Sequence, residues 1–219
     1  MHLPFADRAE AGRLLADRLI ALDLHAPVVL ALPRGGVPVG FEVARRLSRP
    51  DEPAAFDVLV TRKIGYPPQP ELGVGAIAEG GEPVLDLPLL DRLGLGEGDL
   101  AATVGSERAE MDRRIAVYRD RRPLPDLAGK TAIVVDDGLA TGGTARAALR
   151  AVRVRGPARL ILAVPVGAAE TVAAMREEAD DVVVLAEPRR FHAVGQWYSR
   201  FDQLTDDDVL RLLERAGVK

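Results

Sequence analysis

Two neighbouring carboxylates and a run of small residues stand where one predicted strand gives way to a predicted helix. Residues 131–135 form an apolar, mostly β-branched run, which is typical of a strand buried on both faces of a parallel sheet. Asp136 and Asp137 follow directly, and residues 138–144 read Gly-Leu-Ala-Thr-Gly-Gly-Thr. The backbone N–H groups of such a turn, its threonine hydroxyls and the start of a helix suit a phosphate. A carboxylate pair accepts hydrogen bonds from a diol or holds Mg²⁺ through water. The pattern therefore indicates a ligand with both a phosphate and neighbouring hydroxyls, such as ribose 5-phosphate.

A second turn of the same kind follows an earlier predicted strand. Residues 28–32 are apolar, and Arg34, Gly35 and Gly36 come soon after them, before a helical pattern. Glycines let the backbone approach a ligand closely, and arginine supplies charge and donors. Alone this pattern is weak, because glycine turns after strands are common. Together with residues 131–149 it indicates a second anion-binding loop.

Two adjacent cations close a third predicted strand. Residues 56–60 are mostly apolar, and Arg62 and Lys63 follow them. Ligands of open α/β sheets bind at the carboxyl ends of the strands, so both cations are candidates for an anion site. The alternative is a solvated strand end without a ligand.

Residues 64–81 are rich in proline and glycine and predict a flexible lid loop beside the site. Residues 73–78 within it read as a short strand. Glu71 and Glu79 are the carboxylates in this segment. A solvated side chain is the simpler interpretation of both, and Glu71 is the better candidate for a proton acceptor.

The remaining elements predict how these motifs come together. Apolar runs at residues 159–166 and 181–186 read as further strands, and helical patterns separate the strands along the chain. This alternation predicts an α/β fold with a doubly wound, mostly parallel sheet flanked by helices. Because the three motifs all follow strands, we expect them at one edge of the sheet. Residues 1–219 are expected to form a single domain.

The composition narrows the class of protein. The chain has 219 residues, 47% of them hydrophobic, and a net charge of −4. Such a chain can bury a sizeable core, but its acidity makes it a poor candidate for nucleic-acid binding. The absence of cysteine excludes disulfides and thiolate catalysis. No apolar run reaches membrane-spanning length, and the first residues lack the pattern of a signal peptide. A cytoplasmic protein without membrane contact is therefore expected.

The acidic pair followed by Thr-Gly-Gly-Thr closely resembles the signature of the type I phosphoribosyltransferases, which bind 5-phosphoribosyl 1-pyrophosphate (PRPP). The resemblance implies that Asp136 and Asp137 contact the ribose 2′- and 3′-hydroxyls. It also implies that one loop holds the 5′-phosphate, namely Ala140, Thr141, Gly142, Gly143 and Thr144.

The other two motifs also match this family. Arg34, Gly35 and Gly36 look like its pyrophosphate loop, which often contains a non-proline cis peptide, expected here near Arg34–Gly35. Arg62 and Lys63 match the start of the family's flexible catalytic loop, where they would contact pyrophosphate. The resemblance runs from residue 28 to residue 201. It is closest to bacterial members with an unassigned acceptor, which share Leu-Pro-Arg-Gly-Gly-Val, Arg-Lys-Ile-Gly and Ala-Val-Gly-Gln-Trp-Tyr.

Aromatic residues gather after the last predicted strand. The family builds a variable hood there, expected here at about residues 187–204, that stacks on the nucleobase. Trp197 and Tyr198 are the expected base-binding residues, with Phe191 as a further candidate. The alternative is that these rings only pack on the core. His192 has no visible partner and reads as a structural or surface residue.

The resemblance implies a Mg²⁺-dependent transfer of ribose 5-phosphate from PRPP to a small-molecule acceptor, with release of pyrophosphate, as in nucleotide salvage. Asp136 and Asp137 would hold the metal through water or the ribose hydroxyls. The implied catalytic residues are Arg34, Lys63 and Glu71. Hypoxanthine-guanine enzymes carry an acid at the position of Ala140, so a 6-oxopurine acceptor that uses this acid is disfavoured. Adenine, orotate, uracil and non-nucleobase acceptors stay open.

Two other functions compete with this one. A regulatory protein could bind PRPP at the same site without transferring it. A different nucleotide-binding α/β protein is the third alternative, although the chain lacks Gly-Lys-Ser/Thr and Gly-x-Gly-x-x-Gly loops after a strand. Dimers are frequent in the family, so a homodimer is a further expectation.

Overall fold

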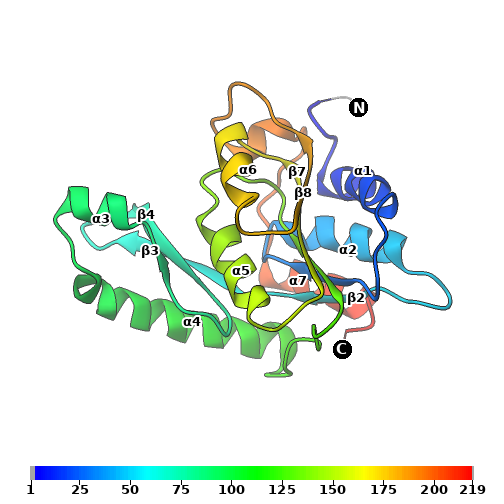
Figure 1. The fold of residues 1–219 in the computed structure, drawn as a ribbon, viewed down its shortest axis with the longest axis horizontal. Coiled ribbons are helices and arrows are strands. Elements are labelled where there is room, and N and C mark those ends of the chain that lie inside the picture. Colours follow the sequence, from blue (N-terminus) through cyan, green and yellow to red (C-terminus); the bar gives the residue numbers. More distant parts are fainter. Residues whose placement is uncertain (1–2, 219) are drawn as a thin grey trace.

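Five parallel strands form the central sheet of the computed structural model, which describes residues 3–218. The expected α/β fold with a mostly parallel sheet is confirmed. Figure 1 shows this sheet with helices on both sides. In spatial order the strands are β2 (Ala55–Val58), β1 (Val28–Ala31), β6 (Thr131–Val135), β7 (Arg159–Val166) and β8 (Asp181–Ala186).

Alternate residues of each strand face opposite layers of helices, as the pleat of a strand requires. Val29 and Ile133 pack toward α1 (Arg8–Ile20), α2 (Gly36–Leu47) and α7 (Asp206–Arg215). Leu30 and Val134 pack toward α5 (Gly143–Arg153) and α6 (Ala169–Met175). Both faces of the sheet are therefore buried, which explains why its strands are continuous apolar runs.

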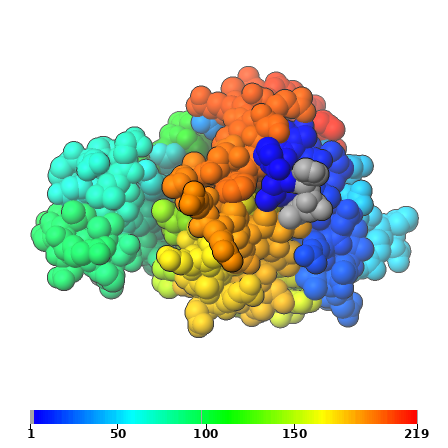
Figure 2. Space-filling view, turned by 90° about the horizontal axis from the view of Figure 1, so that it is seen from above, coloured from blue at the N-terminus to red at the C-terminus, as the bar shows by residue number. Residues whose placement is uncertain are grey.

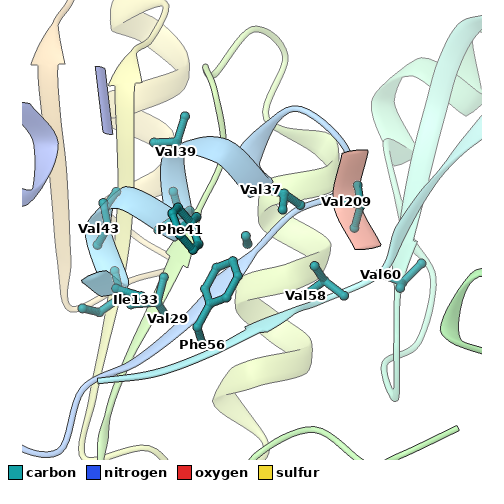
Figure 3. Packing of buried hydrophobic residues seen from close by; sticks show 14 of the residues in the cluster. Val29, Val37, Val39, Phe41, Val43, Phe56, Val58, Val60, Ile133 and Val209 are labelled. Carbon is teal, nitrogen blue, oxygen red and sulfur yellow. The ribbon is translucent and has the colours of Figure 1, made fainter. Parts of the chain in front are cut away.

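Aromatic residues close the core between α2 and the outer strand β2. The rings of Phe41 and Phe56 meet edge to face with centroids 6.3 Å apart. Figure 3 shows these rings beside Val29, with Val43 on α2 above the sheet. Burying this cluster fixes α2, and the loop that precedes α2 carries the arginine and glycines identified above.

Residues 61–119 form an arm that projects from the sheet, as Figures 1 and 2 show. A three-stranded antiparallel sheet makes up one side of the arm and helices make up the other. Its elements are β3 (Thr61–Tyr66), β4 (Gln69–Ala78), β5 (Val84–Leu85), α3 (Leu87–Leu93), the short 3₁₀ helix η1 (Glu97–Leu100) and α4 (Ala101–Arg119).

For residues 64–81, the short strand expected at residues 73–78 is confirmed as part of β4, but the loop expected for the rest of the segment is wrong. β3 and β4 pair over most of this segment and form a hairpin with its turn at residues 67–68. The pairing shifts register on both sides of Gly65. A Cβ atom at this position would lie 2.5 Å from the carbonyl oxygen of Pro70. The glycine therefore marks a β-bulge with close backbone contact, which a sequence pattern does not distinguish from a flexible loop.

The N-terminal segment packs against the residues that follow β8. Asp7 caps α1 by accepting a hydrogen bond from the backbone of Glu10. Phe5 forms backbone hydrogen bonds with the segment around Tyr198, which follows the 3₁₀ helix η2 (Val194–Trp197). Within residues 3–218, no helix is both long enough and apolar enough to cross a membrane.

Candidate active site

The pyrophosphate-like loop and the acidic pair lie side by side because they follow adjacent strands. β1 and β6 pair in parallel, with Ala31 opposite Val135, so both chains leave the sheet at the same edge. A Cβ atom on Gly35 would lie 2.1 Å from Oδ2 of Asp137. Only glycine fits at this position without displacing the carboxylate. The structure thus brings together two motifs that are about 100 residues apart in the sequence.

Asp137 is held from several directions. Its side chain is 13% exposed, and Oδ2 accepts a hydrogen bond from Nε of Arg8 at 2.8 Å. Its backbone carbonyl accepts a hydrogen bond from the hydroxyl of Tyr198 at 2.6 Å. Burial raises the pKa of Asp137, and the Arg8 guanidinium offsets part of that rise. This carboxylate is fixed in place before any ligand arrives.

Asp136 lies beside it with less support. It is half-buried, and its Oδ1 accepts a hydrogen bond from the backbone N–H of Asp137 at 2.8 Å. Burial, together with the charge of Asp137, raises the pKa of Asp136 well above its usual range. Two neighbouring carboxylates thus share one cation, Arg8. A bound cation or a pair of hydroxyl donors would stabilise their charged forms.

The predicted phosphate loop leads into α5. Gly142 adopts a left-handed conformation with φ of 76° at the start of this helix, and Thr171 on α6 donates a hydrogen bond to the carbonyl of Ala140 at 2.6 Å. The first N–H groups of a helix have no partner within the helix. Here they adjoin a pocket of about 600 Å³ whose wall includes Thr141, Gly143 and Thr144. The arrangement suits an anion.

The two predicted pyrophosphate cations point to different places. Successive side chains of a strand face opposite sides. Lys63 lines the phosphate pocket and donates a hydrogen bond to the carbonyl of Glu71 at 2.9 Å. Arg62 instead forms an ion pair with Glu107 on α4, with Nε and Oε2 2.6 Å apart. Lys63 therefore faces the phosphate loop, and the guanidinium of Arg62 faces helix α4 within the arm.

The two lid carboxylates also differ. Glu71 is exposed at a pocket of about 550 Å³ between the hairpin and α4. Glu79 forms an ion pair with Arg119, whose side chain is fully buried, so the solvated interpretation of Glu79 is wrong. Glu79 and Arg119 are 40 residues apart in the sequence, and no local sequence pattern predicts their contact.

The two predicted base-stacking residues, Trp197 and Tyr198, differ in how deeply they are buried. Trp197 is half-buried and stacks on Phe191, with centroids 6.4 Å apart. Tyr198 is only 5% exposed and packs between Phe5 and Phe201. A stacking role for Tyr198 is therefore unsupported, and its hydroxyl instead fixes the backbone beside the acidic pair. His192 is exposed, in line with a surface role.

Two residues of the site, Arg8 and Phe201, belong to none of the sequence motifs. Arg8, on the first turn of α1, reaches the acidic pair, and its guanidinium lies 3.8 Å from the ring centroid of Phe201. Together with Arg34 and Asp137 they line a pocket of about 410 Å³. Arg8 lies among ordinary helix residues in the sequence, so only the packing of the chain ends reveals it. The cis peptide of the pyrophosphate-like loop joins Pro33 to Arg34, one residue earlier than expected.

The acidic pair has the donor chemistry for Mg²⁺. Mg²⁺ prefers oxygen ligands and often binds through one or two carboxylates together with substrate phosphates and water. Asp136 and Asp137 provide carboxylates next to the predicted phosphate sites. No cluster of three or more His, Asp or Glu side chains suited to a metal occurs among residues 3–218. The residues therefore fit a metal that shares its ligands with a bound phosphate compound.

Comparison with known proteins agrees with the motifs and the geometry. The family model described as a phosphoribosyl transferase domain matches residues 7–200. A Mycobacterium tuberculosis protein, whose name gives it provisionally as a phosphoribosyl transferase, is 47% identical over 212 residues. That match covers 97% of this chain and 47% of the relative, so the chain spans about half the length of this relative.

Two further relatives differ in coverage. The crystal structure of TT1426 from Thermus thermophilus has a TM-score of 0.80 and 42% identity, and the match covers 96% of this chain and 98% of that one. A uracil phosphoribosyltransferase of Lactobacillus gasseri is 33% identical over 141 residues, which are 59% of this chain and 62% of that enzyme. Residues 7–200 match the family model, and the chain therefore belongs to the phosphoribosyltransferase family.

Proposed function

We propose that this chain binds PRPP and transfers its ribose 5-phosphate group to a small-molecule acceptor, with Mg²⁺ bound alongside PRPP. The observation that carries this proposal is that three features, namely the Arg34–Gly36 turn, the acidic pair and the phosphate loop, come together at the ends of two paired strands. The Arg34–Gly36 turn touches Asp137, and the phosphate loop begins directly after the acidic pair. These features suit the pyrophosphate, the diol and the 5′-phosphate of one PRPP molecule.

Each part of the site has a role in this reaction. Residues 140–144 bind the 5′-phosphate, and the two carboxylates accept hydrogen bonds from the ribose hydroxyls. The bond between C1 and the pyrophosphate oxygen breaks, and pyrophosphate leaves with the electron pair. The acceptor then bonds to C1 and loses a proton. Arg34 and Lys63 stabilise the charge that develops on pyrophosphate. Bound Mg²⁺ would neutralise further negative charge on this leaving group.

The proposed reaction also requires the hairpin of the arm to move. Residues 64–81 would move toward the phosphate loop and exclude water from the reactive sugar. Lys63 already lines the pocket between the hairpin and the phosphate loop. Glu71 stays the proposed proton acceptor, since it lies on the same hairpin. Residues 187–204 would cover the acceptor, and Trp197 would stack on it. A homodimer stays a prediction.

A regulatory protein that binds PRPP without transfer is the second proposal. It is favoured by the contacts of the two arm cations, because Arg62 is paired with Glu107 and Lys63 is bonded to a backbone carbonyl. In this arrangement Glu107 neutralises the charge of Arg62, and Lys63 uses one of its three N–H donors on the carbonyl.

Pyrophosphate release separates these functions. Purified protein, PRPP and Mg²⁺ would be incubated with uracil, orotate, adenine or hypoxanthine in turn, and pyrophosphate would be measured. The transferase predicts release that depends on one acceptor and on Lys63. Saturable PRPP binding without release for any acceptor would favour the regulator. The absence of PRPP binding would contradict both proposals.

A further inference from the structure

The Arg8 guanidinium is held in a fixed plane at the edge of the proposed acceptor site. Its Nε donates to Asp137 at 2.8 Å, and its Nη1 donates to the backbone carbonyl of Asp202 at 2.9 Å. The ring of Phe201 lies against the guanidinium at 3.8 Å. The side chain is only 11% exposed. Contacts from three directions leave it little freedom to turn.

The pocket beside Arg8 is separate from the phosphate pocket. It has a volume of about 410 Å³ and shares Arg34, Gly35 and Asp137 with the proposed PRPP site. The pocket of about 600 Å³ at the phosphate loop has none of these residues in its wall. Asp137 thus forms part of the wall of the smaller pocket and not of the phosphate pocket. A planar acceptor that reaches the sugar through the smaller pocket would lie against Arg8.

The chemistry of Arg8 limits which edge of a ligand can face it. A guanidinium has five N–H donors and no acceptor. Within residues 3–218, Nη2 of Arg8 has no hydrogen-bond acceptor, and Arg34 forms no ion pair. An amino group facing Arg8 would place donor against donor, whereas a carbonyl or carboxylate oxygen would accept a charge-assisted hydrogen bond.

We infer that Arg8 is a specificity-determining residue, and that the acceptor presents a carbonyl or carboxylate oxygen, rather than an amino group, to it. This inference rests on the proposed function, because it assigns the pocket to the acceptor of that reaction. The inference narrows the set of acceptors left open by the sequence. It disfavours adenine, which has an exocyclic amino group, relative to uracil and orotate, which have ring carbonyl groups.

Nucleoside monophosphates, as analogues of the reaction product, test this inference without knowledge of the true acceptor. Uridine and cytidine 5′-monophosphates differ by an oxo or amino group on the ring, and so do inosine and adenosine 5′-monophosphates. Calorimetric titration should show the oxo member of at least one pair binding about tenfold tighter or more, the size expected for one charge-assisted hydrogen bond. Arg8→Met should reduce this ratio to about threefold or less. Arg18→Met, an exposed arginine on the same helix α1, should leave the ratio unchanged.

Ribose 5-phosphate separates the possible failures. It should bind the wild type, and because Arg8 also fixes Asp137, any loss of its binding in Arg8→Met should be shared by both members of each nucleotide pair. Circular dichroism would show that the variant is folded. Tighter binding of the amino members, no preference in the wild type, or a preference that survives in Arg8→Met overturns the inference alone. A loss in Arg8→Met that is equal for ribose 5-phosphate and for both members of every nucleotide pair would show that Arg8 acts only through Asp137, which also overturns it. If ribose 5-phosphate does not bind the wild type, the proposed function itself fails.

Discussion

The parallel sheet and the arm position their functional residues by different means. In the sheet, the acidic pair and both loops follow strands that are buried on both faces, and Asp137 is fixed by Arg8, Tyr198 and the close approach of Gly35. In the arm, Lys63 lies on a hairpin that projects from the body, as Figure 1 shows. The proposed sugar and phosphate half of the site is thus prebuilt, whereas the position of the lysine depends on how the arm is attached.

Buried charged residues contribute to that attachment. Arg119 at the end of α4 is fully buried and pairs with Glu79 at the end of the hairpin. Asp57 on β2 is also fully buried, and Arg122 lies 3.1 Å from its Oδ2. Burial raises the pKa of Asp57. The apolar core of the sheet continues into the arm through residues such as Ile77 and Tyr118, and this buried polar cluster adds to that attachment.

The largest effect is expected where the arm joins the sheet. Arg119→Met would leave the carboxylate of Glu79 buried without its partner, which costs about 3–5 kcal/mol of the free energy of unfolding. Arg108→Met removes an exposed pair on the same helix and should cost about 1 kcal/mol or less. Urea unfolding would measure both. Adding Glu79→Met to Arg119→Met should recover most of the loss, and equal midpoints for the two single variants would contradict this account of the attachment.

A smaller but specific effect is expected in the prebuilt half. Gly35→Ala would place Cβ 2.1 Å from Asp137, so the loop or the carboxylate must move. A misplacement of this size can cost about 100-fold, which here should appear as weaker PRPP binding in a calorimetric titration. Gly105→Ala on α4 is the matched control, because a Cβ atom there meets nothing within 4 Å. Similar PRPP affinity in both variants would argue against contact between the two motifs in the working enzyme.

The two cations of the arm should respond differently to truncation. Lys63→Ala should lower kcat/KM for PRPP by about 10–100-fold, because a cation near the leaving pyrophosphate is lost. Arg62→Ala should have the smaller effect on kcat/KM, since Arg62 is already paired with Glu107. Steady-state kinetics with saturating acceptor would compare them. A larger loss in Arg62→Ala would mean that Arg62 leaves Glu107 during the reaction.

The acidic pair should make the free protein sensitive to pH. The pKa of Asp136 is raised in the folded state, so the folded protein keeps a proton that the unfolded chain has already released. Stability should therefore fall as pH rises from the usual range of Asp through the raised pKa. Asp136→Asn should remove this part of the slope and stabilise the protein at neutral pH, by about 1.4 kcal/mol for each pKa unit of the rise. Exposed Asp91→Asn should keep the slope, and urea unfolding at several pH values would show it.

Much of the sheet could be predicted because its determinants are local. Apolar runs specify the buried strands, and the acidic pair and phosphate loop are contiguous with one of them. A strand at residues 73–78 was predicted, but its pairing with β3 in a hairpin was not, since the glycines of this segment mark a bulge as readily as a loop. Arg8 and the Glu79–Arg119 pair also escaped prediction, because their partners are distant in the sequence and the contacts exist only after the ends or the arm have packed. Tyr198 was recognised as part of the site, but its burial was not.

Calorimetric titration with PRPP, with and without Mg²⁺, tests the central claim most directly. The wild type should show saturable binding that Mg²⁺ strengthens, and a variant with both Asp136→Asn and Asp137→Asn should show none while staying folded by circular dichroism. An unchanged affinity in the double variant would remove the acidic pair from the site. No binding by the wild type at millimolar PRPP would contradict the account as a whole.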